Sequence, residues 1–184
     1  MKKTVLTFGL LSGVVASLLM VGTIPMMHRI GFDKGLFVGY TAIILSLLFV
    51  FFGIRSYREN VAGGSISFGK AFGVGILITL ISCVFYVVTW EILYFNFLPD
   101  FCEKWTAYAV EQLRASGSGQ AAIDAKIQEM KALKAMMDNP FKNAAMAFIE
   151  PFPVGLIITL ISAAILKRKH PTTTISVPSE AATG

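Results

Sequence analysis

Charged residues are scarce in this sequence. Asp, Glu, Lys and Arg together make up only 15% of its 184 residues, whereas about 25% is usual in a soluble domain. Hydrophobic residues account for 55%. A soluble chain of this length could bury one good core, but it would not contain long runs without charge. The shortage of charge therefore argues against a soluble globular protein.

Cysteine and histidine are also rare, at two residues each. Cys83 and Cys102 are nineteen residues apart, or about 28 Å along a helix, whereas a disulfide needs Cα atoms within about 7 Å. We expect no disulfide within the chain, and Cys102 is predicted to be either a shielded apolar residue or a free thiol that links two chains. His28 and His170 fall on opposite sides of the membrane in the topology that the charges predict, so they cannot share a metal ion.

Catalytic patterns are absent as well. The sequence brings no Ser/His/Asp set together and has no Cys/His cluster with the spacing of metal ligands. Residues 64–71 match the phosphate-loop pattern G-x-x-x-x-G-K, but Ala71 stands where that motif needs Ser or Thr, and a phosphate loop follows a strand. A turn with a helix cap at Ser65 or Ser67 explains the segment better. We expect no enzyme activity, no cofactor and no metal.

Long apolar runs are what the sequence does contain. There are four, at about residues 5–24, 36–54, 72–94 and 148–166. Each is close to the ~20 residues that span about 30 Å of hydrocarbon. The predicted fold is all-α, with one membrane domain over residues 1–169 built as a four-transmembrane-helix bundle. The tail at residues 170–184 is rich in Thr, Ser, Ala and Pro and is predicted to be a disordered cytoplasmic segment.

Small residues recur at four-residue spacing in every run, which gives each predicted helix a face for close packing. Residues 75–82 and 155–162 even share a nearly identical string, G-x-x-I-T-L-I-S. Such a pair is typical of the inverted repeats of transporters, or it serves the same packing need in both helices. We favour the second interpretation because the flanking sequences differ.

The polar segment between the third and fourth runs, about residues 97–139, is predicted to form an extracytoplasmic amphipathic helical hairpin. Pro99 suits a first helical turn, the sequence Ser-Gly-Ser-Gly at 116–119 marks the turn between two helices, and Asn139 with Pro140 ends the second helix. The helices could pack on each other or lie on the membrane surface. Their nearly balanced charges favour mutual packing.

The basic residues predict the orientation of the bundle. Eight Lys and Arg flank the runs on the side of the termini, against only Arg29 and Lys34 in the loop between the first two runs. By the positive-inside rule both termini are cytoplasmic. Residues 1–3 and the run after them resemble a signal peptide. The run is long and no A-x-A-like site follows it, so an uncleaved first span is expected.

Two acidic residues are candidates for a site. Glu91 and Glu150 are predicted to lie at similar depth near the outer membrane face, and an acid within a span is by default a functional hypothesis. We predict that they line one polar pocket, together with Arg29. The alternative is a structural role, with Glu91 facing interfacial water and Glu150 favoured by the dipole of a helix that starts at Pro151.

The basic residues on the cytoplasmic side are candidate contacts for anionic lipid headgroups, or topology signals that reach towards the headgroups. They are Arg55, Arg58, Lys70, Lys167, Arg168 and Lys169. Because the net charge of +5 is concentrated beside the membrane, nucleic acid is not an expected partner.

Short motifs spread along the chain carry one further signal. They are F-G-I-R-S-Y-R-E-N at 52–60, G-S-I-S-F-G-K-A-F at 64–72 with Gly75, Y-V-V-T-W at 86–90, P-D-F at 99–101 and E-P-F-P-V-G at 150–155. In these segments, and in the order of helices and loops up to about Lys169, the chain resembles the family known as domain of unknown function 4199 (DUF4199). The resemblance implies a small bacterial envelope protein with four membrane helices and no established activity.

The leading prediction for function is an accessory or interaction protein of the bacterial cytoplasmic membrane. Packing faces on every span and a folded outer hairpin favour it. The alternative is a small transporter or channel that uses Glu91 and Glu150. The expected partners are membrane lipids, and a second copy of the chain or another membrane protein.

Overall fold

The computed structural model describes the backbone of residues 1–168, and all of their side chains except those of residues 25–30, 32 and 33. The predicted disordered tail at 170–184 lies outside the described residues. Within them, the chain is helical and forms no strand, which confirms the all-α prediction. In order, the helices are α1 (Lys2–Ile30), α2 (Phe32–Asn60), α3 (Phe68–Phe97), α4 (Phe101–Ala115), α5 (Gln120–Met137), α6 (Pro140–Ile149) and α7 (Pro151–Leu166).

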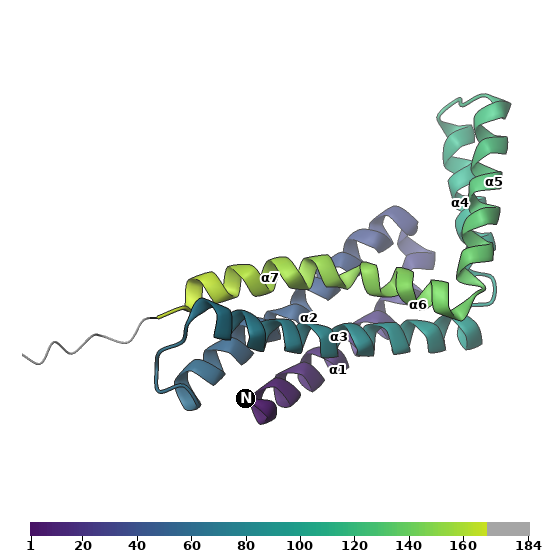
Figure 1. The fold of residues 1–184 in the computed structure, drawn as a ribbon. Helices are drawn as coiled ribbons and strands as arrows, with labels where there is room; N and C mark the ends of the chain where they lie inside the picture. Colours follow the sequence, from purple (N-terminus) through teal and green to yellow (C-terminus); the bar gives the residue numbers. More distant parts are fainter. Residues whose placement is uncertain (169–184) are drawn as a thin grey trace, which may run out of the picture.

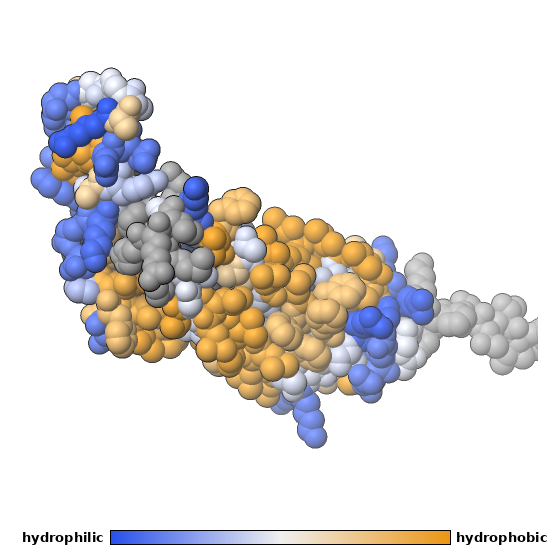
Figure 2. Space-filling view, turned by 180° about the vertical axis from the view of Figure 1, so that it is seen from behind, coloured by the Kyte–Doolittle hydropathy of each residue, from blue (hydrophilic) through white to orange (hydrophobic). Residues whose placement is uncertain are grey.

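Four helical segments are long and apolar enough to cross a membrane, as predicted. They are Lys2–Ile24, Lys34–Asn60, Phe68–Phe97 and Pro140–Leu166. Apolar side chains cover the surface of the bundle, while polar ones gather on the hairpin and at the opposite end (Figure 2). Leu18 is 67% exposed and Phe37 78% exposed, a surface that suits lipid better than water. The chain is therefore a multi-pass membrane protein.

Two spans begin earlier than predicted because polar residues cap them. The Ser67 side chain accepts a hydrogen bond from the Lys70 backbone N–H at 3.4 Å, so α3 starts at Phe68 instead of residue 72. Asn139 caps α6 in the same way, accepting from the Lys142 N–H at 3.1 Å. The fourth span therefore begins at Pro140, before the residue 148 that hydropathy alone predicts.

Small residues bring α1 and α3 close together. A Cβ atom on Gly9 would lie 2.9 Å from the Ile81 side chain, so only glycine fits there without a shift. About two turns further along the same two helices, the hydroxyls of Ser17 and Thr89 are 2.7 Å apart. The predicted packing face of the first span is therefore in use.

The two nearly identical strings pack against each other. Gly75 on α3 faces Thr159 on α7, and Gly155 on α7 faces Thr79 on α3. The hydroxyls of Thr79 and Thr159 lie 3.1 Å apart at the centre of this contact. Because the helices run in opposite directions (Figure 1), the same string supplies both halves of a locally two-fold contact. The repetition thus has a packing explanation, as favoured above.

The half of the bundle that carries the termini is closely packed; we call it the termini half. Val50, Ile54, Val74 and Ile78 have no exposed surface there. At its boundary, the Ser12 hydroxyl donates to the Ser46 carbonyl at 2.8 Å, and its Oγ lies 3.0 Å from the Ser82 Oγ, within hydrogen-bond distance. One side chain thereby connects α1, α2 and α3.

The loop between α2 and α3 is tied to the end of α7. Ile66 and Arg168 exchange two backbone hydrogen bonds, of 3.0 and 2.9 Å. The Arg58 guanidinium donates to the Leu166 carbonyl at 3.4 Å, which satisfies an end group of α7. Gly63 and Gly64 have positive φ values of 64° and 87°, so the predicted glycine turn is present.

Helices α4 and α5 pack on each other as the predicted hairpin, with Ile123 and Met130 buried between them. Gly117, at φ 74°, forms the turn. The hairpin runs across the direction of α3 and α6 instead of continuing it (Figure 1). At its base Cys102 is 2% exposed, and its Sγ lies 3.6 Å from the Met137 sulfur. Both cysteines are free and buried, so Cys102 is the shielded apolar residue of the two alternatives.

Candidate functional site

A break in the fourth span shapes the hairpin end of the bundle. Pro151 has no backbone N–H to continue the hydrogen bonding of α6, so α6 ends at Ile149 and α7 begins at Pro151. Glu150 lies in the break. The helices on either side of the break have different neighbours. Helix α7 packs against α2 and α3, whereas α6 packs mainly against α3 and α5. The structure thus confirms that a helix starts after Glu150 and shows that another precedes it.

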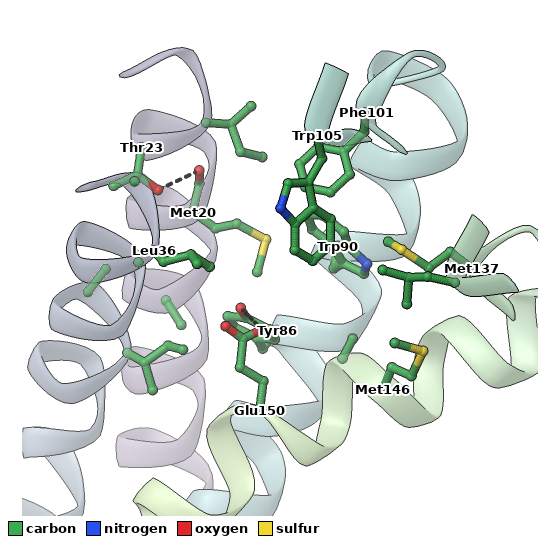
Figure 3. Close-up of a pocket in the computed structure, with 18 residues that line it drawn as sticks. Met20, Thr23, Leu36, Tyr86, Trp90, Phe101, Trp105, Met137, Met146 and Glu150 are labelled. Atoms are coloured by element: carbon green, nitrogen blue, oxygen red, sulfur yellow. Dashed lines mark hydrogen bonds between the residues drawn. The ribbon is translucent and has the colours of Figure 1, made fainter. Parts of the chain in front are cut away.

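A cavity of about 330 Å³ lies at this end of the bundle, between α1 and α2 on one side and α3 and α6 on the other. One wall comes from α1 and α2 and is aliphatic, with small residues that leave room. The opposite wall comes from α3 and α6, and the base of the hairpin closes the top (Figure 3). The lining residues are Ala16, Met20, Thr23, Ile24, Gly35, Leu36, Gly39, Ala42, Ile43, Tyr86, Trp90, Phe101, Trp105, Leu133, Met137, Met146, Ala147 and Glu150.

The Glu150 carboxylate is the charged group of this cavity. Its side chain extends from the helix break towards Tyr86, with Met20 on the opposite wall (Figure 3). The Tyr86 hydroxyl donates to Oε2 of Glu150 at 2.7 Å. No Lys, Arg or His is found among the described lining residues. A carboxylate in an apolar site without a cation is costly, so this arrangement needs a reason beyond packing.

Three aromatic side chains of α3 form hydrogen bonds with polar side chains from residues 138–150. Besides the Tyr86 bond, the Trp90 Nε1–H donates to the Asn143 Oδ1 at 2.8 Å, and the Tyr94 hydroxyl donates to the Asp138 Oδ1 at 3.2 Å. Each aromatic residue follows the last by four positions and therefore lies on the same helix face. These pairs were not predicted from the sequence, although the four-residue spacing of Tyr86, Trp90 and Tyr94 was a visible signal.

Glu91 does not join Glu150 in the cavity. It follows Trp90 directly, so its side chain points about 100° away from that residue around α3, and it is not among the lining residues. It also lies five residues beyond Tyr86, or about 7.5 Å along the helix. Its Oε1 is buried and has no hydrogen-bond partner among the described residues. The cavity thus contains one of the two predicted acids, and the Arg29 side chain lies outside the described residues.

Comparison with known proteins places the chain in one family. The sequence profile of the family described as protein of unknown function (DUF4199) matches residues 7–168, which include most of the first span, the other three spans and the hairpin. The chain belongs to the DUF4199 family. No curated protein and no solved structure gave a significant match. Membership confirms the resemblance seen in the sequence and assigns no activity, so the function of this DUF4199 protein has to be argued from its own site.

The predicted lipid contacts of the DUF4199 protein lie at the other end of the bundle. Arg55 pairs with Glu59 at 3.0 Å, and Arg58 is occupied by Glu59 and the end of α7. Lys70 and Arg168 line a shallow pocket there, beside the N-terminus of α3. Lys167 is exposed, and Lys169 lies beyond the described residues.

No metal centre emerges in the part of the DUF4199 protein that the structure describes. There, no group of three or more His, Cys, Asp or Glu side chains is close enough to hold an ion. What the cavity offers is one carboxylate, a phenol that donates to it, indole rings and a large apolar surface. This combination can bind a molecule that is mainly apolar and carries one polar group.

Proposed function

We propose that this DUF4199 protein is an accessory protein of the membrane that binds an amphipathic molecule in the cavity between α1 and α2 on one side and α3 and α6 on the other. One observation carries the proposal: the half-buried Glu150 carboxylate projects into a space whose walls are otherwise apolar and aromatic. Ligand sites commonly have this make-up, with volumes of about 300–1,000 Å³. The 330 Å³ of this cavity suits a small ligand.

Binding is a better account than transport because the path beyond the cavity is closed. Transport would require passage through the layer of Ser12, Ser46 and Ser82 and past the Thr79–Thr159 contact. Beyond this layer, the core of the termini half is filled by Val50, Ile54, Val74 and Ile78, which have no exposed surface. A transporter or channel that uses Glu91 and Glu150 would also need both acids on one path, and the cavity includes only Glu150.

The charges give the proposal an orientation. With both termini on the cytoplasmic side of a bacterial inner membrane, the cavity lies in the outer half of the bilayer, below an external hairpin. The exposed Lys70, Lys167 and Arg168 would then contact anionic lipid headgroups of the cytoplasmic leaflet. An accessory role needs no catalytic group, and we assign none.

Intrinsic fluorescence provides a direct test. The chain has only two tryptophans, and both line the cavity. Purified protein in a neutral maltoside detergent is titrated with three probes of similar size and different charge. They are tetraphenylphosphonium, triphenylphosphine oxide and tetraphenylborate. We expect at least one of them to change the tryptophan emission in a saturable way.

Two glycine variants make this test specific. A Cβ atom on Gly39, which lines the cavity, or on Gly73, which does not, would meet no atom within 4 Å. Gly39→Leu should fill the cavity and abolish the saturable signal, whereas Gly73→Leu should keep it. If no probe gives a saturable signal, or if Gly39→Leu retains all of it, the proposal is wrong.

A further inference from the structure

The polar group that the cavity recognises can be named from its chemistry. Building on the proposed function, we propose that the ligand is a lipophilic cation whose charged centre pairs with Glu150. Three features of the described cavity support this choice: the unpaired charge of the acid, the aromatic rings beside it and the apolar walls around them.

The first feature is the state of the carboxylate. Tyr86 donates to Oε2, whereas a carboxylate has room for several donors on its two oxygens. That hydrogen bond involves Oε2 alone, and Glu150 lines the cavity, so Oε1 remains for a ligand. No described lining residue carries a positive charge. A cationic ligand would supply the missing counter-charge.

The second feature is the ring system next to the acid. Tyr86 and Trp90 lie one helical turn apart on α3, and both line the cavity with Glu150. The Trp90 and Phe101 rings have centroids 5.3 Å apart and meet almost edge to face, at 83°. Aromatic faces attract cations within about 6 Å, and indole does so most strongly. The rings therefore favour the same ligand charge as the acid does.

The third feature, the apolar wall, accounts for the apolar body of the ligand, and the acid beside it disfavours the other charge types. The aliphatic wall, including Met20, Leu36 and Ile43, gives affinity for any apolar body and does not discriminate charge. An anion would meet Glu150 at close range in a low dielectric, where like charges repel strongly. A neutral ligand would bury the carboxylate further and leave it unpaired. Only a cation improves the electrostatics of the site.

The three probes of the fluorescence titration test this inference in the wild-type protein, without any variant. Tetraphenylphosphonium and tetraphenylborate have nearly the same shape and opposite charge. We expect the cation to bind about tenfold or more tightly than the anion and more tightly than the neutral oxide. Equal or tighter binding of the anion or the oxide would overturn the cation assignment. It would leave the binding function standing, because the site would still hold a ligand.

Variants then assign the preference to one carboxylate. Glu150→Gln should weaken phosphonium binding about tenfold or more, because it removes the counter-charge, while binding of the neutral oxide stays within about twofold. Glu91→Gln is the matched control, an acid in the same part of the bundle but outside the lining, and should leave both affinities unchanged. Full phosphonium affinity in Glu150→Gln would overturn the inference.

Tyr86→Phe keeps the test decisive if Glu150→Gln does not fold. It removes the hydroxyl that competes for the carboxylate and keeps the ring and the acid. Phosphonium should therefore bind at least as tightly as in the wild type. Because the hydroxyl also stabilises the ionised carboxylate, this variant is titrated at about pH 9, where the acid keeps its charge. A loss of about tenfold there would mean that Glu150 is not the anchor.

Discussion

The two halves of this bundle are built from similarly apolar helices and pack in opposite ways. In the termini half, α7 lies against α2 and α3 through glycine and threonine, and buried aliphatic side chains fill the space. In the hairpin half, the part of the fourth span that precedes Glu150, α6, packs against α3 and α5, and a cavity remains between it and the first two helices. Hydrophobicity alone therefore does not decide whether a membrane bundle closes. Residue size and the continuity of the helices decide it.

The largest expected effect comes from enlarging a residue in the closed half. Gly155→Leu would place a side chain into Thr79 of α3. We expect a loss of about 1–3 kcal/mol of folding stability, or failure to fold, because a packed contact has no room for added atoms. The measurement is the temperature at which the protein loses monodispersity in detergent. Gly73→Leu is the control, since a Cβ there meets nothing within 4 Å. An equal loss of stability in both variants would mean that close packing at Gly155 is not the cause.

The next effect should convert the open half into a closed one. Pro151→Ala restores the backbone N–H that the helix break lacks, so α6 and α7 can join into one straight helix. We expect severalfold weaker binding of the fluorescence probes together with stability equal to or above that of the wild type. Pro153→Ala, in the first turn of α7 beyond the break, provides the comparison. Unchanged probe binding in Pro151→Ala would mean that the proline does not create the cavity.

A smaller effect is expected where the two halves meet. Ser12→Ala removes the hydroxyl that connects three helices. Hydrogen bonds between membrane helices contribute about 0.6 kcal/mol on average, so two of them should cost about 1 kcal/mol in the same thermal assay. Thr41→Ala serves as the control because its hydroxyl bonds only to the carbonyl of Phe37 on its own helix. An equal effect of the two variants would mean that the Ser12 hydroxyl stabilises the bundle no more than a hydroxyl bonded within one helix does.

The smallest effect concerns the hairpin, outside both halves. Burial alone would lower the pKa of Lys134, but the hydrogen bond and charge of Asp138, together with Glu103, raise it above the usual lysine value. The raised pKa means that this stabilisation is complete below about pH 10.4 and is lost as the pH rises through the folded-state pKa. Because the pair is exposed, the change should be small. Near-ultraviolet circular dichroism of Trp105 would follow it, and Lys134→Gln should remove the pH response.

The sequence predicted the membrane architecture well because spans and caps are local properties. Twenty apolar residues must form a hydrogen-bonded helix in lipid wherever they occur in the chain. The turn at 116–119 and the helix start at Pro151 were found for the same reason. For α3 the cap was predicted at Ser65 or Ser67, and Ser67 provides it, although hydropathy placed the span start at residue 72. The start of α6 was missed because hydropathy does not see the cap at Asn139.

The site was predicted less well because it depends on helix rotation. Depth along a span follows from residue number, so Glu91 and Glu150 were rightly assigned to one end of the bundle. Which way each side chain points depends on which face of α3 meets α6 and α7. One residue of difference separates Trp90, in the cavity wall, from Glu91 outside it.

By itself, then, the sequence determined that this chain is a membrane protein, how many helices can span the membrane and that a polar hairpin separates the third and fourth spans. These properties follow from the solvation of consecutive residues. Only the tertiary structure decided that the string shared by α3 and α7 is one contact, and that Glu150 pairs with Tyr86 in the wall of a cavity that Glu91 does not line. Those outcomes depend on how four helices rotate against one another, and that rotation is fixed by packing between residues far apart in the chain.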